Sequence, residues 1–201
     1  MENIDVIYYI NLAHRTDRNT HILNELKKVI TKEKRLYRID AIYDEYGIIG
    51  CVKSHIATIM NFMESGLENC IILEDDFEFT ESKEKINELL TLFFKNIKSY
   101  DVLMLSSNTF EETNVYPGLN KILNSQTTSG YCLHKNFAQK LLDNFIEGLA
   151  FLTKTKDRIY SLDIYWKKLQ PNNNWYCLQP RIGKQISGYS DIDNKYRNYK
   201  C

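Results

Sequence analysis

The sequence lacks an excess of either charge, since its 26 Lys and Arg residues are balanced by 26 Asp and Glu residues. No overall field would therefore steer the protein toward nucleic acid or an anionic membrane. It also lacks any apolar run close to the roughly 18 residues that span a bilayer, and its first residues, with Glu2 and Asp5, do not resemble a signal peptide. We therefore expect a cytoplasmic protein with no membrane span and no nucleic-acid partner.

Cysteine is present, but not in pairs that would build a disulfide framework or a zinc site. The five cysteines are odd in number, far apart and outside any C-x-x-C motif: Cys51, Cys70, Cys132, Cys177 and Cys201. This spacing predicts reduced thiols, as in cytosolic proteins. The chain also has no P-loop and no G-x-G-x-x-G motif, which weakens kinase-like and dehydrogenase-like interpretations. No repeat, low-complexity tract or linker divides it, so we expect a single domain over residues 1–201.

Short apolar runs alternate with helical patterns over the first half of the chain. Strands are expected at 4–10, 36–39, 70–73 and 101–105, and helices at 16–30, 49–65 and 82–97. This β-α-β alternation predicts an α/β fold with a mostly parallel central sheet flanked by helices. Later residues are less regular. There we expect a loop at 108–120, a strand at 128–133, helices at 136–146 and 162–169, and short strands with a polar tail after Trp175.

Three consecutive carboxylates, Glu74, Asp75 and Asp76, directly follow the apolar run 70–73. They repel one another unless a cation neutralises them. Mg²⁺ and Mn²⁺ prefer oxygen ligands and are commonly held by one or two carboxylates together with substrate phosphates. In open α/β sheets, ligands bind beyond the carboxyl ends of the strands, where this triplet falls. The triplet therefore points to a divalent metal site, and a solvated acidic turn that caps the next segment is the alternative.

Four short motifs follow one another along nearly the whole chain. They read I-N-L-x-x-R-x-D-R at 10–18, G-C-x-x-S-H at 50–55, L-E-D-D at 73–76 and S-G-Y at 129–131. In these motifs the sequence resembles glycosyltransferase family 25, which contains bacterial lipooligosaccharide galactosyltransferases and collagen hydroxylysine galactosyltransferases. Two positions depart from the family pattern: Ile48, where members often carry Glu, and Ile59, where an aromatic residue often follows the His. Both bear on donor identity and acceptor binding.

The resemblance implies a GT-A-type, Rossmann-like nucleotide-sugar-binding fold. Its nucleotide-sugar-binding half would be 1–107, and its acceptor-side half with a C-terminal loop would be 108–201. The resemblance also implies a UDP-sugar donor, Mn²⁺ (or Mg²⁺) as cofactor, and transfer of a hexose, galactose or glucose, to an acceptor hydroxyl with inversion. The acceptor stays open among a saccharide, a lipid-linked glycan, a capsid glycan and a protein hydroxyl such as collagen hydroxylysine.

Donor-binding residues are expected mainly in the first half of the chain. Asn11, Arg15 and Arg18 lie where the first strand meets a helix N-terminus, a place suited to a diphosphate, and donor binding is expected for Asn11 and Arg15. A local ion pair between Asp17 and Arg18 is the alternative role for those two residues. His55 lies in the first turns of an apolar helix, where a satisfied half-buried imidazole is the alternative. The full set of donor-binding candidates is Asn11, Arg15, Ser54, His55, Glu74, Asp75 and Gly130.

Catalytic and metal-binding roles are expected for three aspartates. Asp76 is the first choice as metal ligand and catalytic residue, with one of its acidic neighbours orienting the ribose or completing the coordination. Asp191 is the candidate for a second metal ligand in a polar C-terminal segment, where a disordered tail over 194–201 is the alternative. Asp163 matches the family's late aspartate and would take the acceptor's proton as general base. A helix-start carboxylate favoured by the macrodipole is the alternative for Asp163.

Two other classes of function are compatible with the same residues. A catalytically inactive binding module would show metal-dependent donor binding without transfer, although the retention of three mutually repelling acids argues against it. A nucleotide-sugar hydrolase would also use a metal at a strand end, and it would release UDP with water as its sole acceptor. The sequence favours a glycosyltransferase over both.

Overall fold

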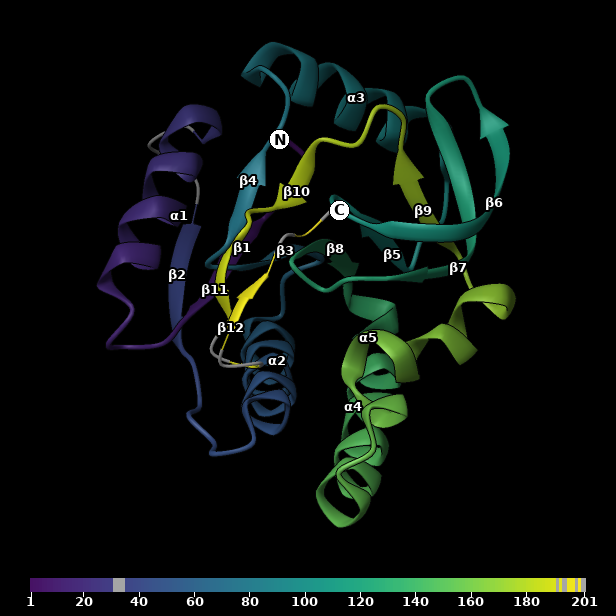
Figure 1. The fold of residues 1–201 in the computed structure, drawn as a ribbon. Coiled ribbons are helices and arrows are strands. Elements are labelled where there is room, and N and C mark those ends of the chain that lie inside the picture. Colours follow the sequence, from purple (N-terminus) through teal and green to yellow (C-terminus); the bar gives the residue numbers. More distant parts are fainter. Residues whose placement is uncertain (31–34, 191, 193–194, 198, 200–201) are drawn as a thin grey trace.

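An eight-stranded sheet forms the centre of the computed structural model, which describes residues 1–30, 35–190, 192, 195–197 and 199. Its strand order is β2-β1-β3-β8-β5-β9-β7-β6 (Figure 1). Pairing is parallel across β2, β1 and β3 and between β5 and β9, and antiparallel between the other neighbours. The strands are β1 (Val6–Asn11), β2 (Arg35–Asp40), β3 (Asn69–Glu74), β5 (Val102–Met104), β6 (Asn108–Tyr116), β7 (Leu119–Gln126), β8 (Gly130–His134) and β9 (Trp175–Leu178).

The predicted α/β class, with a central sheet flanked by helices, is confirmed. Parallel pairing dominates the half of the sheet built from the first β-α-β units, β2, β1 and β3. β8 runs opposite to its neighbours β3 and β5, because the hairpin of β6 and β7 reverses the chain before β8 begins. Across its full width the sheet is therefore mixed.

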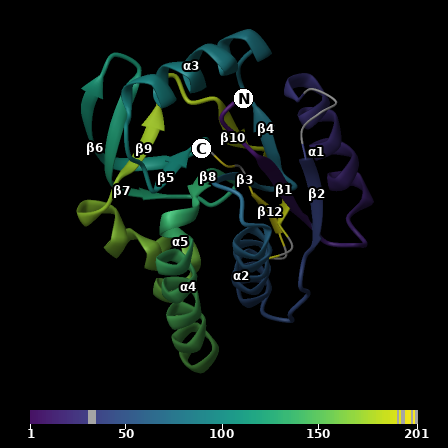
Figure 2. The same cartoon turned by 180° about the vertical axis from the view of Figure 1, so that it is seen from behind.

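Helices cover both faces of the sheet, and the side chains of β1 alternate between two cores. Val6, Tyr8 and Ile10 pack with α2 and α4, whereas Ile7 and Tyr9 pack with α1 and α3. Figure 1 shows α3 above the sheet and α2 and α4 below it, and Figure 2 shows the same layers from behind. The helices are α1 (Thr16–Val29), α2 (Gly47–Ser65), α3 (Lys83–Asn96), α4 (Lys135–Thr155) and α5 (Leu162–Tyr165). None of the helices in the described part of the chain is both long and apolar enough to cross a membrane.

The expectation of a loop at 108–120 is wrong, because this segment belongs to the hairpin of β6 and β7. Nearly all of β6 is exposed, and register shifts interrupt its pairing with β7. The period-2 alternation that marks a half-buried strand is therefore absent. The sequence signal of this hairpin is its turn, Pro117-Gly118. Gly118 has a φ of +85°, a value that glycine adopts readily after proline in a tight turn.

The C-terminal part also differs from the expectation. The helix expected at 162–169 is one turn of α5 followed by a 3₁₀ helix at Trp166–Asn172, which contains Pro171. Two short strands pair next to the acidic triplet, and both are too short to show the alternation of apolar and polar residues that marks a strand. The first directly follows the triplet, and the second brings the C-terminal part of the chain back to it. They are β4 (Phe77–Phe79) and β10 (Gly183–Gln185), and they are followed by a second pair, β11 (Gly188–Ser190) and β12 (Lys195–Arg197).

Candidate active site at the carboxyl edge of the sheet

The carboxyl ends of neighbouring parallel strands bring the acidic triplet to one edge of the sheet. β1 ends at Asn11 and β3 ends at Glu74, and the two strands pair in parallel. Asp75 and Asp76 form the turn between β3 and β4. The triplet therefore lies beyond the carboxyl ends of the strands, where α/β proteins bind ligands.

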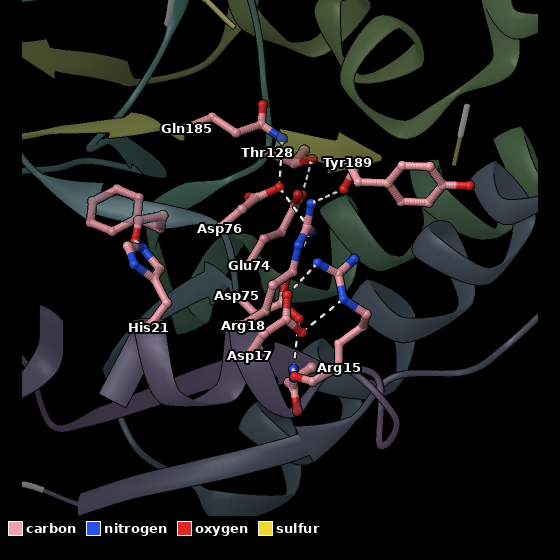
Figure 3. A network of polar contacts seen from close by, with 12 residues as sticks. Arg15, Asp17, Arg18, His21, Glu74, Asp75, Asp76, Thr128, Gln185 and Tyr189 are labelled. Atoms are coloured by element: carbon pink, nitrogen blue, oxygen red, sulfur yellow. Dashed lines mark hydrogen bonds and ion pairs between the residues drawn. The ribbon is translucent and has the colours of Figure 1, made fainter. Parts of the chain in front are cut away.

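Arg18, in the first turn of α1, places a positive charge against the triplet (Figure 3). Its Nη1 donates to Asp75 Oδ1 and to Asp76 Oδ2, each at 3.1 Å. Its Nη2 donates to the backbone oxygen of Tyr189 at 2.7 Å. Arg18 thus joins the two aspartates to the segment that contains β11.

Asp75 has both carboxylate oxygens bonded to protein donors. Asn11 Nδ2 donates to Oδ2 at 2.7 Å, and Arg18 donates to Oδ1. Burial raises the pKa of Asp75, and these two donors oppose the rise. Asn11 is itself buried and accepts a hydrogen bond from Arg38 Nε at 3.2 Å. Asn11 and Asp75 therefore hold the acidic turn in place.

Asp76 differs, because only one of its carboxylate oxygens is bonded. Gln185 Nε2 donates to Oδ2 at 3.0 Å beside Arg18, whereas Oδ1 is buried and has no hydrogen-bond partner among the described residues. Burial and the nearby Glu74 carboxylate raise the pKa of Asp76 to about 7. A buried oxygen without a donor is costly, and a hard divalent cation would satisfy it. The residues present therefore fit a Mn²⁺ or Mg²⁺ ion at this oxygen.

Glu74 is bonded through one oxygen, Oε1. Thr128 Oγ1 donates to it at 2.7 Å, and His55 Nε2 lies 3.2 Å from it. The other imidazole nitrogen, Nδ1, lies 3.0 Å from the hydroxyl oxygen of Tyr131. Burial raises the pKa of Glu74, but His55 and Thr128 outweigh burial, so the pKa lies below its usual value. These contacts therefore favour the charged carboxylate and lie at Oε1, on one side of the group.

Two pockets meet at Glu74. The first runs from the triplet along the start of α2 to Tyr43, and Asp76 lies in its wall. The second lies on the side of α5 and contains Asp163. The residues common to both walls include Cys51, Glu74, Gln185 and Ser190. A ligand in one pocket would therefore lie next to a ligand in the other.

Asp163 is held in the second pocket by two donors. Ser161 Oγ donates to Asp163 Oδ1 at 3.2 Å, and the backbone N–H of Thr127 also donates to this carboxylate. The φ of Thr127 is 92°, in the left-handed region that a β-branched residue rarely adopts. Such strained residues cluster at functional sites. Burial raises the pKa of Asp163, and the charge of Glu74 adds to the rise while Ser161 opposes it.

The candidate donor-binding residues separate into two groups. Those that line the first pocket are Ser54, His55, Glu74 and Asp75. Those that line neither of the two pockets are Asn11, Arg15 and Gly130. Arg15 binds Asp17, with 2.8 Å between Nη2 and Oδ2, so the alternative of an ion pair between Asp17 and Arg18 is wrong. Asp191 lies outside the described residues.

The sequence assigned no role at the site to Cys51 or Thr128, and it placed Arg18 only near the expected diphosphate. Arg18 and Cys51 stand inside the first and second motifs, and Thr128 directly precedes the fourth. Their positions in or beside the motifs were the signal in the sequence that could have identified them as site residues. Their partners, however, come from strands and loops distant in the sequence, and a local pattern does not reveal such contacts.

Gly130 packs closely enough to make a side chain harmful. A Cβ at this position would lie 2.4 Å from the Phe77 ring and 3.2 Å from a methyl carbon of Leu73. We expect Gly130→Ala to lower the free energy of unfolding by about 1–3 kcal/mol in urea titrations. Gly188→Ala is the matched control, because a Cβ there meets no atom within 4 Å, and it should change stability by less than about 0.5 kcal/mol. Equal losses in the two variants would contradict this packing role.

Comparison with known proteins addresses the family directly. The model of glycosyltransferase family 25, described as an LPS biosynthesis protein, matches residues 45–151, which is more than half of the 201 residues. The matched stretch contains the second, third and fourth sequence motifs. No curated protein matches the sequence.

Solved structures share the fold at low sequence identity. A glycosyltransferase involved in the glycosylation of the major capsid of PBCV-1 has a TM-score of 0.54 at 10% identity, over 94% of this chain and 95% of that chain. A197 from STIV has a TM-score of 0.50 at 11% identity, over 98% and 95%. Mannose-1-phosphate geranyltransferase from Thermus thermophilus has a TM-score of 0.51 at 9% identity, over 88% and 73%. These likenesses concern the fold, whereas the family match covers the motifs, and on that match the chain belongs to glycosyltransferase family 25.

Proposed function

We propose that the chain transfers a hexose, galactose or glucose, from a UDP-sugar to an acceptor hydroxyl, with inversion and with Mn²⁺ or Mg²⁺ as cofactor. The observation that carries the proposal is the meeting of two pockets at Glu74, one beside Asp76 and the other containing Asp163. Inversion requires the attacking hydroxyl and its base to lie across the sugar from the leaving group. Two adjacent pockets with separate carboxylates support that arrangement.

The donor diphosphate would bind in the first pocket. Asp76 Oδ1 is buried without a partner among the described residues, and His55 and Thr128 contact Glu74 at Oε1, so Asp76 Oδ1 and Glu74 Oε2 are the atoms that would hold the ion. When bound, the ion supplies positive charge that offsets the charge developing on the departing UDP. Arg18 adds a second positive group at the same edge. Asp191 stays a predicted second ligand.

The acceptor would enter the second pocket, next to Asp163. As the acceptor oxygen attacks the anomeric carbon, its proton passes to the Asp163 carboxylate. The bond from the anomeric carbon to the diphosphate oxygen breaks, and UDP leaves with that electron pair. The raised pKa of Asp163 makes this carboxylate a stronger base than an exposed aspartate. The acceptor is a saccharide, a lipid-linked glycan or a protein hydroxyl.

Thermal unfolding with and without Mn²⁺ tests the donor class. At about 100 times its Kd, one UDP-hexose should stabilise the protein by ~2.7 kcal/mol, and thus raise Tm by several degrees, only when Mn²⁺ is present. UDP-galactose, UDP-glucose, a GDP-sugar and EDTA are compared in parallel. The response should vanish in Asp76→Asn, because that variant lacks the oxygen that would hold the ion. Stabilisation by the GDP-sugar, or an unchanged response in Asp76→Asn, would contradict the proposal.

Measurement of UDP release separates transfer from the two alternative functions. If the chain is a transferase, a suitable acceptor hydroxyl raises the rate of UDP release above the rate in water and appears in a glycosylated product. A rate that no acceptor improves would identify a hydrolase. Metal-dependent donor binding with no UDP release, across acceptors of all three classes, would identify an inactive binding module.

A further inference from the structure

Cys51, His55 and Glu74 bring three different metal-binding atoms together where the two pockets meet. Cys51 and His55 are one helical turn apart on α2 and lie on the same face of that helix, and Glu74 reaches them from the end of β3. The Cys51 sulfur, a His55 ring nitrogen and a Glu74 oxygen all lie within 4.8 Å of one another. His55 Nε2 and Glu74 Oε1 are 3.2 Å apart, which matches two ligands of a tetrahedral ion with bonds of about 2.0 Å.

The groups behind two of these side chains, His55 and Glu74, are arranged as in a metal site. His55 is fully buried, and its Nδ1 lies 3.0 Å from the buried hydroxyl of Tyr131. With the proton on Nδ1, that nitrogen donates to the Tyr131 oxygen, and Nε2 presents a lone pair to an ion. Thr128 Oγ1 donates to Glu74 Oε1 at 2.7 Å. Imidazoles and carboxylates that bind metals usually have such second hydrogen bonds, which orient them toward the ion.

We propose that Cys51, His55 and Glu74 form a binding site for Zn²⁺ or a divalent ion of similar softness. Sulfur, imidazole nitrogen and carboxylate oxygen are ligands that Zn²⁺ takes together, whereas Mg²⁺ and Mn²⁺ prefer oxygen. Binding transfers the thiol proton of Cys51 to solvent, so that the sulfur coordinates as a thiolate. The site shares Glu74 with the oxygen site at Asp76 but takes no ligand from Asp76.

The three ligands leave a position for a fourth. Cys51 and Glu74 both line the two pockets, so an ion between them has access to the cleft. Zinc sites with three protein ligands keep such an open position for water or substrate. An ion at this site would therefore lie between the proposed donor and acceptor pockets.

Titration of the full chain with Co²⁺ tests the site, because Co²⁺ accepts the ligands of zinc sites and its absorption spectrum reports them. Wild-type protein freed of metal with EDTA should develop a thiolate-to-cobalt charge-transfer band in the near ultraviolet that saturates with one Co²⁺ per chain at this site, apart from any Co²⁺ bound at the oxygen site at Asp76. Cys51→Ser should lose this band and bind Zn²⁺ at least about 10-fold more weakly in calorimetry. Cys177→Ser, at a buried cysteine that lines neither pocket, is the matched control and should keep the band.

If circular dichroism shows that Cys51→Ser is unfolded, two further variants still test the proposal. Thr128→Val removes the hydrogen bond to Glu74 but no ligand, so it should weaken Co²⁺ binding and retain the charge-transfer band. Asp76→Asn should retain the band while it abolishes the Mn²⁺-dependent response to UDP-sugar, so the two metal proposals can fail independently. A wild-type spectrum without a thiolate band, or a band that survives in Cys51→Ser, would overturn the proposal.

Discussion

Replacing Asp76 with asparagine is expected to lower the kcat of sugar transfer by about 10³-fold, equivalent to ~4 kcal/mol in the barrier. Arg18 and Gln185 both donate to Asp76 Oδ2. An asparagine would therefore turn its carbonyl oxygen toward these two donors and place its amide nitrogen where Oδ1 lies. That position would carry a donor in place of the oxygen that would hold the cation. Initial rates of product formation at saturating donor and acceptor measure the loss.

Stability provides the control for Asp76→Asn. Because Asp76 Oδ1 is buried without a partner among the described residues, removal of the charge should leave the free energy of unfolding unchanged or higher. Asp75→Asn is the matched variant, since both oxygens of Asp75 accept from protein donors. It should cost about 1–3 kcal/mol of stability and lower kcat far less than Asp76→Asn does, because Asp75 is not the residue proposed to hold the ion. A kcat for Asp76→Asn within about tenfold of wild type would contradict the role proposed for Asp76.

Replacing Asp163 with asparagine is expected to lower kcat by about 10²–10⁴-fold, the range contributed by general base catalysis. The variant loses the carboxylate that would receive the acceptor's proton. The affinity for UDP-sugar should change little, because the proposed donor contacts lie in the first pocket and Asp163 lines the second. Steady-state kinetics with each substrate varied in turn separate the effect on kcat from the effect on donor binding. A large rise in the KM for UDP-sugar at unchanged kcat would contradict the base role.

The pH dependence of kcat gives a second readout for Asp163. A general base acts only when ionised, and burial holds the pKa of Asp163 above its usual value. At Mn²⁺ concentrations that keep the proposed ion bound at Asp76, the kcat of the wild type should therefore rise with pH through a pKa above the ~3.9 of an exposed aspartate, and this acidic part of the profile should be absent in Asp163→Asn. Asp157→Asn is the matched control. Asp157 caps the 3₁₀ helix Arg158–Tyr160 by accepting from the Ile159 N–H, and asparagine caps equally well. Its kcat and the acidic part of its pH profile should therefore match those of the wild type.

The sequence predicted the helices and strands of the first half well, for identifiable reasons. β1 and β3 are nearly continuous apolar runs, typical of strands buried on both faces. Ser82 caps α3 by accepting from the Lys85 N–H, and Gly66 ends α2 with a φ of 68°. These signals are local, so they can be interpreted without knowing the fold. The exposed strand β6 carries no such signal, and its pairing with β7 was not predicted.

The residues of the candidate site were identified less completely than the elements that carry them. Glu74 and Asp76 were singled out because three acids after a buried strand repel one another. Their different environments could not be predicted, since Asp75 is bonded to Asn11, 64 residues away, and Asp76 to Gln185, 109 residues away. Cys51 was likewise interpreted only as a scattered thiol and as a position of the second motif, without a role at the site. Its neighbours His55 and Glu74 come from a helix turn and a strand end.

By itself, the sequence determined the class of fold, the edge of the sheet at which the acids lie and the family to which the motifs belong. These properties follow from apolar periodicity, strand ends and residue order, which are local along the chain. Only the tertiary structure decided which carboxylate oxygens are bonded and which are free, and which residues line each of the two pockets. The physical reason is that hydrogen-bond donors such as Arg18, Thr128 and Gln185 reach the acids from distant segments, and only the packing of the sheet against its helices brings them within bonding distance.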